Sequence, residues 1–545
     1  MLKPGKTYAA TYRSCRWNIP DFFNIGVDIC DKWAADPDRL ALIYENETGK
    51  VENYTFKIIK EYSDKLANTF TALGLGIGDR VAILLPQRSE TAIAHIAAYK
   101  VGAIAIPLFT LFGTDALSYR LSNSGAKIII TDKANLEKIE AIRSDLPQLD
   151  YVLVTDLDKS SDNILSFRRV IEKAAGHCRP VQTKKDDPAL IIYTSGTTGP
   201  PKGALHAHRT LLGHLPGVEF PHNFFPQAGD LFWTPADWAW IGGLIDVLFP
   251  SWHHGIPVLA HRARKFDPEQ AFHLMAKHRV RNVFMPPTAL KVMRQVKEPQ
   301  KHYDFHLRSI GSGGETLGEE LLNWGRDVFG LTINEFYGQT ECNLIVGCCA
   351  EVMEARPGSM GRAIPGHRVE IIDEEGKPLP SGVIGQIAVK SPDPVMFLQY
   401  WQNPQATREK FLGDWLLTGD LAKMDEDGYF WFQGRADDII TSSGYRIGPA
   451  EIEDCLMKHP AVSMVAVVGS PDEKRTEVVK AFIIPKADVT LGPDVEEDIK
   501  NFVKVRLAAH EYPRKIEFVT ELPMTTTGKI KRKELKQLEI DRSRA

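Results

Sequence analysis

Residues 193–203, with the sequence YTSGTTGPPKG, combine Ser and Thr hydroxyls with three glycines and one lysine. Glycines let backbone N–H groups come close to an anion, hydroxyls donate hydrogen bonds, and a lysine adds positive charge. A Walker A loop requires G-x-x-x-x-G-K-[ST], but here Pro201 replaces the second glycine and Gly203 replaces the magnesium-binding hydroxyl. An apolar strand before the loop and an expected helix after it favour a phosphate loop of another kind over a surface turn.

Other residues that could take part in binding or catalysis also have ordinary structural explanations. Glu341, in the segment YGQTE, could hold a cation or could be a solvated surface acid. Lys529 lies in the basic stretch MTTTGKIKRK, which by itself is typical of a solvated tail. Trp233, Trp238 and Trp240 lie within eight residues and could form either a core or the walls of a pocket. The chain lacks a GxSxG nucleophile elbow, so covalent serine catalysis is not expected.

The elements that must position these residues alternate between strands and helices up to about residue 345. Residues 80–86, 88–101 and 103–108 form a strand–helix–strand unit, which favours a parallel sheet. The pattern restarts at residues 189–194. Further strands are expected at 126–131, 151–155, 257–260, 281–285, 307–310 and 331–336, and a further helix at 267–278. The sequence therefore predicts an α/β fold with two doubly wound sheets in a large N-terminal domain.

The character of the chain changes after about residue 351. Residues 368–373 and 385–390 predict a hairpin, and the DEDG turn at 425–428 precedes a further strand. We therefore expect a small β-barrel-like subdomain over about 351–436, within an N-terminal domain of residues 1–436. Residues 437–545 contain two β-branched runs and a helical segment, which predicts a small, compact C-terminal α+β domain. The polar stretch GRADD at 434–438 marks the boundary.

The composition is that of an ordinary globular protein. The 545 residues are 43% hydrophobic and 25% charged, and the formal net charge of −4 gives no indication of a nucleic-acid partner. Seven scattered cysteines without a CxxC pair favour a reducing compartment and argue against a zinc site. No integral membrane segment is expected. Cytoplasmic localisation is the first expectation, and the basic, acid-poor residues 1–20 leave the mitochondrial matrix as the alternative.

Together, the loop and four further stretches resemble the adenylate-forming enzymes, the superfamily of acyl-CoA synthetases, luciferases and peptide-synthetase adenylation domains. These stretches follow in the family's order: YGQTE at 337–341, TGD at 418–420 with GRADD at 434–438, SGYRIGPA at 443–450, and PMTTTGK at 523–529. The resemblance covers essentially the whole chain. Through SSGYRIGPAEIE and YPRKIEF the chain is most similar to medium-chain acyl-CoA synthetases. One departure is Cys342-Asn343, where the family has Thr-Gly, close to where the acyl group is expected.

The resemblance implies an acid–thiol ligase reaction in two steps. A carboxylate attacks the α-phosphorus of ATP and expels pyrophosphate, and the thiol of CoA then displaces AMP from the acyl-adenylate. The implied cofactors and co-substrates are ATP, Mg²⁺ and CoA. Because negative charge moves onto the leaving pyrophosphate, catalysis requires positioning and charge neutralisation more than a protein nucleophile.

By the same resemblance, Lys529 would bridge the carboxylate and the α-phosphate, Thr340 would contact the α-phosphate, and Glu341 would hold Mg²⁺. Lys529, Thr340 and Glu341 are therefore the expected catalytic residues. Asp420 would accept hydrogen bonds from both ribose hydroxyls, and Arg435 would contact the ribose or a phosphate. The implied ATP-binding residues are Thr194, Ser195, Gly196, Thr197, Thr198, Gly199, Lys202, Gly314, Glu315, Glu335, Phe336, Tyr337, Gly338, Gln339, Thr340, Asp420, Arg435 and Lys529.

The two steps would use different faces of the small domain, which would rotate at a hinge at Asp437. The implied CoA-binding residues are Ser443, Gly444, Tyr445, Arg475, Lys504, Tyr512, Pro513 and Arg514. The first three would line the thiol tunnel, and the cations among the others would meet the phosphates of CoA.

The implied acyl pocket contains Trp238, Trp240, Gly338, Thr340 and Arg446. Acetate-specific relatives carry Trp at the place of Gly338, so the resemblance implies a medium-chain, branched or cyclic acid, as in fatty acid metabolism. His206 and His208 are not expected to act as bases, because a carboxylate is already ionised at pH 7.

Two alternatives stay open: a stand-alone adenylating enzyme that loads a carrier protein, and a non-catalytic ligand-binding homologue. The intact motif residues disfavour the second. The chain ends sixteen residues after Lys529 without an attached carrier domain, which disfavours the first. The expected partners are the small-molecule acid, ATP and CoA, and a homodimer is left open.

Overall fold

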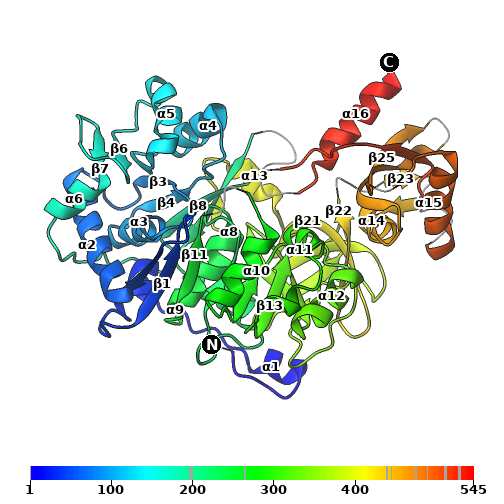
Figure 1. Ribbon diagram of the computed structural model, residues 1–545, viewed down its shortest axis with the longest axis horizontal. Coiled ribbons are helices and arrows are strands. Elements are labelled where there is room, and N and C mark those ends of the chain that lie inside the picture. The colour runs from blue at the N-terminus through cyan, green and yellow to red at the C-terminus, as the bar shows by residue number, and fades with distance from the viewer. Residues whose placement is uncertain are drawn as a thin grey trace.

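The computed structural model describes residues 2–544 except 195–199, 263–264, 437, 439, 443–444, 473–474, 488, 508–511 and 526–528. Of residues 441, 445, 446, 451 and 544 it describes the backbone alone. Figure 1 shows a large body, formed by the N-terminal and middle parts of the chain, and a smaller C-terminal body beside it. Every helix among the described residues is too short or too polar to span a bilayer.

The first sheet has eight strands. Six consecutive strands in the sheet, β8, β4, β3, β5, β6 and β7, run parallel to one another. Helices α2 (Phe56–Ala72), α3 (Ser89–Lys100), α4 (Thr114–Ser124), α5 (Lys133–Ala141) and α6 (Phe167–Lys173) accompany it. The strand order is β19 (Gln399–Tyr400), β9 (Lys202–Ala207), β8 (Pro188–Thr194), β4 (Ile104–Pro107), β3 (Arg80–Leu84), β5 (Ile128–Thr131), β6 (Tyr151–Val154), β7 (Ile164–Ser166).

The second sheet has nine strands, and its six central strands are parallel. Helices α10 (Pro268–Lys277), α11 (Pro287–Met293) and α12 (Glu319–Phe329) belong to this half. The order is β16 (Arg362–Ala363), β15 (Cys342–Gly347), β14 (Ile333–Gln339), β13 (Ser309–Gly313), β12 (Asn282–Phe284), β10 (Phe232–Trp233), β11 (Val258–His261), β1 (Leu40–Glu45), β2 (Val51–Thr55).

The main core lies between the two sheets. It includes α3, whose sequence SETAIAHIAAYK has small or apolar residues on every side and is buried at all but one position. The core also contains α7 (Thr210–Glu219), α9 (Phe249–His253), the short α8 (Ile241–Gly243), and two π-helical turns, η1 (Val27–Asp31) and η3 (Leu244–Leu248). The Lys100 ammonium is buried here, with Asp31 and Asp64 oxygens at 2.7 and 2.6 Å. An ammonium in this position needs both carboxylates because burial of an unpaired charge is costly.

The β-rich subdomain is a five-stranded antiparallel sheet of β17 (Val369–Ile372), β18 (Gly385–Lys390), β21 (Trp415–Met424), β20 (Phe411–Leu412) and β22 (Phe430–Arg435). α13 (Pro404–Glu409) precedes β20. The predicted hairpin is therefore present, since β17 pairs with β18.

The C-terminal α+β unit contains β24 (Tyr445–Ile447), β23 (Ile440–Ser442), β26 (Thr476–Pro485), β25 (Val462–Asp472) and β27 (Lys515–Phe518), with α14 (Pro449–Met457), α15 (Pro493–Arg506) and α16 (Arg532–Arg544). The α/β fold class with two doubly wound sheets and a smaller C-terminal α+β domain is thus confirmed.

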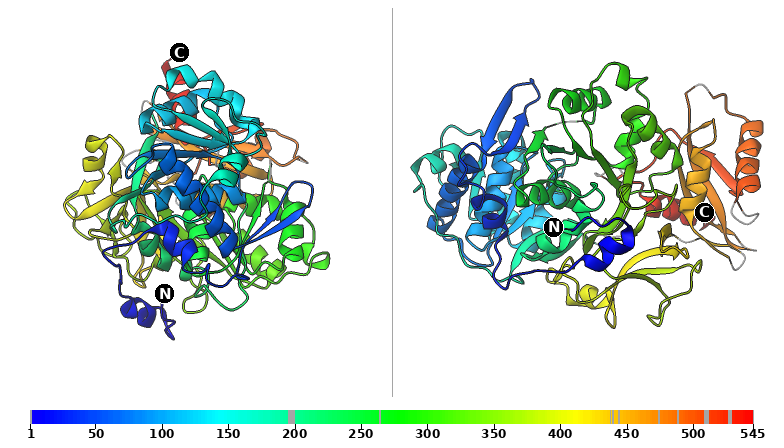
Figure 2. Two further views of the ribbon diagram at one scale, coloured as in Figure 1. Left: turned by 90° about the vertical axis from the view of Figure 1, so that its left-hand side faces the viewer. Right: turned by 90° about the horizontal axis from the view of Figure 1, so that it is seen from below.

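The N-terminal segment, with α1 (Tyr8–Ser14), packs beside the β-rich subdomain (Figure 2, right). The hydroxyls of Tyr8 and Tyr12 donate to the carbonyls of Ala363 and His367, at 2.7 and 2.8 Å. The indole of Trp17 donates to the carbonyl of Gly366 at 3.1 Å. Three ring donors therefore hold this segment against residues far along the chain.

Candidate active site

The glycine-rich loop joins two antiparallel strands, not a strand and a helix. β8 ends at Thr194 and β9 begins at Lys202, and these two residues are paired in the ladder. The helix expected after the loop is therefore wrong: residues 202–207 form β9, which bonds to β8 on one side and β19 on the other. Pro200 and Pro201 lack backbone N–H donors, and pairing with β8 overrides any local helix preference. Ser195, Gly196, Thr197, Thr198 and Gly199 lie outside the described residues.

The segment YGQTE closes β14 and turns into β15. The Tyr337 hydroxyl donates to Asp420 Oδ2 at 2.5 Å, and Gln339 Nε2 lies 3.3 Å from the same oxygen. Gln339 Nε2 also donates to the carbonyl of Thr418 at 2.8 Å, and Lys410 Nζ donates to Gln339 Oε1 at 2.8 Å. The motif on β14 is therefore fastened directly to the TGD motif on β21.

Asp420 and Arg435 face each other across two neighbouring strands. The β21–β22 register pairs them, with Arg435 NH1 3.4 Å from Asp420 Oδ1. Burial raises the pKa of Asp420 above its ordinary value, while the Arg435 guanidinium and the Tyr337 hydroxyl act in the opposite direction. The arrangement presents a fixed carboxyl acceptor with a cation beside it, which suits a vicinal diol linked to phosphate.

Glu341, Tyr400 and Lys202 form a second group at the start of the loop. The Tyr400 hydroxyl donates to Glu341 Oε1, and Lys202 Nζ lies 5.3 Å from the centre of the Tyr400 ring. Burial and the adjacent Glu341 carboxylate raise the pKa of Tyr400. The sequence gives no signal for Tyr400, because it lies 59 residues from Glu341 and arrives through the pairing of β19 with β9.

A magnesium ion would fit beside Glu341, whose carboxylate supplies the oxygen that this hard cation prefers. Among the described residues no group of three His, Cys, Asp or Glu side chains could hold a metal ion. The remaining ligands would therefore be phosphate oxygens and water, as is usual for Mg²⁺ bound with a nucleotide.

Lys529, from the small domain, lies over the large one. Its Cε and Nζ come within 3.7 and 3.9 Å of the Cβ position that Gly314 leaves empty, and Trp240 Cη2 lies 3.8 Å from the same point. Gly314 has a φ of 98°, a conformation suited to glycine. Protein atoms around Lys529 displace water and thereby lower its pKa, whereas the Glu315 and Asp420 carboxylates raise it. The side chain nevertheless remains exposed to solvent. A ligand can therefore reach a lysine that stands between Gly314 and the Asp420 group.

Ion pairs accompany this contact between the domains. Lys458 Nζ, directly after α14, lies 3.0 Å from Glu319 Oε2 in the first turn of α12. Within the small domain, Arg532 at the start of α16 forms two hydrogen bonds to Glu453 on α14, at 3.0 and 2.5 Å. The small domain is thus packed against the large domain with Lys529 directed at the candidate site.

The remaining nucleotide candidates occupy different environments. Glu335 and Phe336 are buried on β14, and burial together with Asp454 raises the pKa of Glu335. Glu315 accepts a hydrogen bond from the Thr288 hydroxyl at 2.9 Å. Thr340 is half-buried at the turn between β14 and β15.

The acyl-pocket candidates differ in burial and packing. Trp238 is fully buried in the main core, whereas Trp240 is half-buried and packs against Phe284 with ring centres 5.7 Å apart. A Cβ added at Gly338 would meet the Leu344 nitrogen at 2.1 Å and Asn343 backbone atoms at 2.9 Å. Glycine at position 338 is therefore required by a neighbouring backbone, whatever the size of the acid. Arg446 is described in its backbone alone.

The CoA candidates are partly brought together. The Tyr512 ring centre lies 5.5 Å from Lys504 Nζ and 4.9 Å from Arg514 Cζ, so two cations flank one ring. Pro513 between them is buried. Arg475 lies at the β25–β26 turn, where its N–H donates to Asp472 Oδ1 at 3.0 Å. Ser443, Gly444 and the hinge candidate Asp437 lie outside the described residues, as does the side chain of Tyr445.

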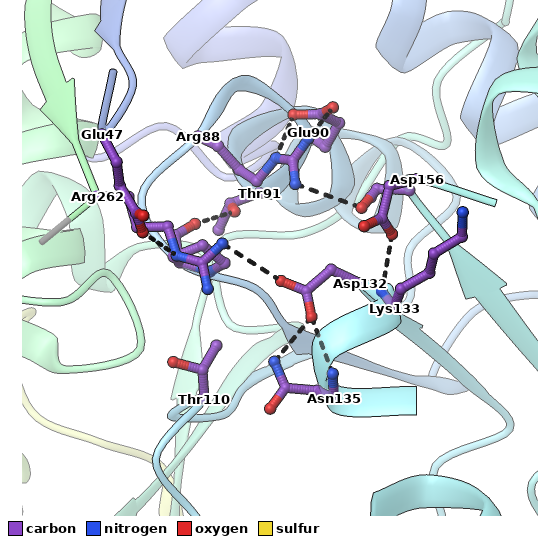
Figure 3. A network of polar contacts seen from close by, with 12 residues as sticks. Glu47, Arg88, Glu90, Thr91, Thr110, Asp132, Lys133, Asn135, Asp156 and Arg262 are labelled. Atoms are coloured by element: carbon purple, nitrogen blue, oxygen red, sulfur yellow. Dashed lines mark hydrogen bonds and ion pairs between the residues drawn. The ribbon is translucent and has the colours of Figure 1, made fainter. Parts of the chain in front are cut away.

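A polar network ties the carboxyl ends of the two parallel sheets together (Figure 3). Arg262, directly after β11, lies between Glu47 Oε1 at 3.4 Å and Asp132 Oδ2 at 3.9 Å, which follow β1 and β5. Thr194 and Gln339 end β8 and β14 at the same edges. Ligands of open α/β sheets bind at this edge, and the network fixes the two edges relative to each other.

Comparison with known proteins agrees with this geometry. The family model "AMP-binding enzyme" matches residues 30–401, and "AMP-binding enzyme C-terminal domain" matches residues 451–529. Acyl-coenzyme A synthetase ACSM2B, mitochondrial, of Homo sapiens is 38% identical over 96% of this chain and 93% of its own. Acetyl-coenzyme A synthetase of Bacillus subtilis is 35% identical over 98% of this chain and 96% of its own.

The solved structures give the same result. The anthranilate CoA ligase AuaEII in complex with anthranoyl-AMP has a TM-score of 0.88 at 28% identity and covers 97% of this chain and 99% of its own. The Brucella canis acyl-CoA synthetase has a TM-score of 0.76 at 32% identity, with 98% and 99% covered. The chain belongs to the AMP-binding, adenylate-forming enzyme family and, within it, to the acyl-CoA synthetases, which are AMP-forming acid–thiol ligases.

Proposed function

We propose that the protein activates a medium-chain, branched or cyclic carboxylic acid with ATP and passes the acyl group to CoA, with rotation of the small domain between the two steps. The observation that carries this proposal is the position of Lys529. A lysine from the C-terminal domain meets Gly314 of the large domain beside the Asp420–Arg435 pair. A removable cation at that point suits a step in which two anions, a carboxylate and a phosphate, must meet.

In this proposal each group has one task in adenylation. Asp420 holds the ribose, and Tyr337 and Gln339 hold Asp420. Lys202 and the loop before it hold the terminal phosphates. Glu341, oriented by Tyr400, would hold Mg²⁺, which offsets phosphate charge when it is bound. Thr340 and Lys529 orient the α-phosphate for in-line attack by the acid.

The second step requires Lys529 to leave, because CoA must reach the same carbonyl. Rotation at Asp437 would withdraw Lys529 and bring the CoA-binding side of the small domain inward. Tyr512, flanked by Lys504 and Arg514, offers an aromatic surface and two cations for the nucleotide end of CoA.

Lys529→Ala tests the proposal, with Lys531→Ala as the matched control. Lys531 lies two residues away in the same basic segment and pairs with Glu534 at 2.8 Å. Lys529→Ala should lose pyrophosphate release by about 10²–10³-fold, the usual effect of removing one transition-state charge contact. It should still convert supplied acyl-adenylate and CoA into acyl-CoA, and the control should do both.

The wild-type protein should release AMP and pyrophosphate from ATP in the presence of a C4–C8 acid and CoA. Release of ADP and phosphate would contradict the reaction. Loss of both half-reactions in a folded Lys529→Ala protein would contradict the alternation of the small domain.

A further inference from the structure

Behind Gly338 lies a buried polar triad that the adenylation machinery does not use. The Oδ1 atom of Asp246, on η3, contacts two side chains. It lies 2.7 Å from His214 Nε2 on α7 and 2.6 Å from Asn343 Nδ2 on β15. All three residues are at least nine-tenths buried. Burial raises the pKa of Asp246, while His214 and Asn343 oppose this shift.

The backbone is shaped to bring these three side chains together. A Cβ at Gly217 would lie 2.6 Å from the Leu344 side chain, so this glycine lets α7 approach β15 closely. Leu344, directly after Asn343, has a φ of 52°, which is rare for leucine, and the β14–β15 register shifts between Tyr337 and Gln339. Asp246 sits on a π-helical turn. Backbone irregularities of these kinds are over-represented at functional sites.

The triad leaves one hydrogen-bond acceptor without a donor. His214 Nε2–H and Asn343 Nδ2–H both donate to Asp246, so their 3.3 Å separation joins two donors and is not itself a hydrogen bond. In that tautomer His214 Nδ1 carries a lone pair, and this buried nitrogen has no partner among the described residues. A ligand that completes the triad must therefore bring an N–H or O–H group.

The triad lies within reach of the reacting carboxylate. Asn343 Cα is 2.9 Å from the Cβ position of Gly338, and Asn343 follows Thr340 by three residues, which limits their Cα separation to about 11 Å. Near the start of α7, Thr210 on that helix and His206 on β9 line a small cavity of about 10 Å³, with room for about one water molecule. Within the part of the chain that the structure describes, Thr210 Oγ1 and both ring nitrogens of His206 are also buried without a hydrogen-bond partner.

We infer that His214, Asp246 and Asn343 determine acid specificity, and that the preferred substrate is a carboxylic acid carrying a hydroxyl or amino donor at its far end. This rests on the proposed function and adds the substrate class. Of the three residues, Asn343 is one of the two that depart from the motif this segment resembles. A site built to bind a substrate donor rejects the analogue that lacks it, because its own polar groups are then left unpaired.

The test compares acids of equal skeleton: hexanoate with 6-hydroxyhexanoate and adipate, and benzoate with its amino- and hydroxybenzoates. kcat/KM is measured by pyrophosphate release with CoA present. For at least one pair, the wild type should have a kcat/KM about tenfold or more higher for the hydroxyl- or amino-substituted acid than for the plain acid. His214→Gln keeps an N–H for Asp246 and removes the Nδ1 acceptor, and Asn343→Gly restores the family residue. Both should bring that ratio towards one while retaining activity on the plain acid.

His95→Gln is the control, because His95 is an equally buried histidine on α3; it should leave the ratio unchanged. A wild-type ratio near one, a ratio that persists in both variants, or a preference for adipate would each overturn the inference. If the wild type activates none of the acids, the proposed function itself fails, which separates the two results.

Discussion

The ion pair between Lys458 and Glu319 provides a quantitative test of domain closure. It joins the C-terminal end of α14 in the small domain to α12 of the large domain at 3.0 Å, and its side chains are 44% and 49% exposed. Because the pair links the two domains in the arrangement that presents Lys529, its reversal should disfavour this arrangement without touching a reacting group.

The expected effect is modest and can be worked out from the geometry. Two unit charges 3.0 Å apart attract by about 1.4 kcal/mol in bulk water, and exposed pairs typically contribute about 0.2–1 kcal/mol. Charge reversal replaces attraction by repulsion of similar size. Lys458→Glu should therefore cost the closed arrangement about 1–2 kcal/mol, or roughly 5–30-fold in its equilibrium with the open one. The effect should shrink in 1 M salt, where the Debye length is about 3 Å.

The assay measures the two half-reactions separately. Adenylation, followed by ATP–pyrophosphate exchange, should slow in Lys458→Glu and in Glu319→Lys and recover in the double variant. Conversion of supplied acyl-adenylate to acyl-CoA should not slow. Lys500→Glu, which breaks an ion pair to Glu496 within α15, is the control and should affect neither step. A double variant as slow as the product of the two single variants would refute the reasoning, since it would show no coupling between the charges.

Three further predictions concern single side chains. Tyr400→Phe removes the hydroxyl that donates to Glu341, so adenylation should need about tenfold more Mg²⁺; an unchanged Mg²⁺ titration would contradict the role given to this pair. Gly338→Ala forces a Cβ against the Leu344 backbone at 2.1 Å, so the thermal midpoint should fall by several degrees, and a stable variant with an altered acid profile would count against this explanation. Burial lowers the pKa of His206 to about 3, so its contribution to stability is present above about pH 6.5 and is lost as the pH falls. Between pH 7 and 5 the wild type should lose up to about 2 kcal/mol more unfolding free energy than His206→Gln, as measured by urea titration; equal losses would argue against a neutral buried imidazole.

The sequence predicted helices and strands well where local signals, such as a capping residue, themselves determine the element. The helix expected at 267–278 is α10 (Pro268–Lys277), because Asp267 caps its first N–H groups and Pro268 favours a helical start. The strand expected at 331–336 is β14, although it continues through Gln339. The helix expected directly after the glycine-rich loop is wrong: residues 202–207 form a strand there, because they pair with the preceding strand β8 on one side and with the distant strand β19 on the other.

The residues of the candidate site also differ in whether local or distant contacts place them. The motif residues that sequence analysis singled out, such as Asp420 and Arg435, lie together because β21 and β22 are neighbours in the chain. Of the triad, the sequence singled out Asn343 alone. Tyr400, His214 and Asp246 depend on contacts between segments up to 129 residues apart, and the residue types at these three positions are ordinary. No spacing rule could place them beside the site, because only the completed packing of α7 and β19 does so.

The N-terminal segment carries a consequence for the order in which the protein folds during synthesis. Tyr8 and Tyr12 bond to carbonyls 355 residues later, and Trp17 to one 349 residues later. At about 5–20 residues per second, a ribosome needs roughly 20–70 s to make the chain between them. Throughout that time the three aromatic side chains lack the carbonyls to which they donate in the folded protein. This segment is therefore synthesised long before the carbonyls that secure it, and until then its ring donors are open to a chaperone or a protease on the nascent chain.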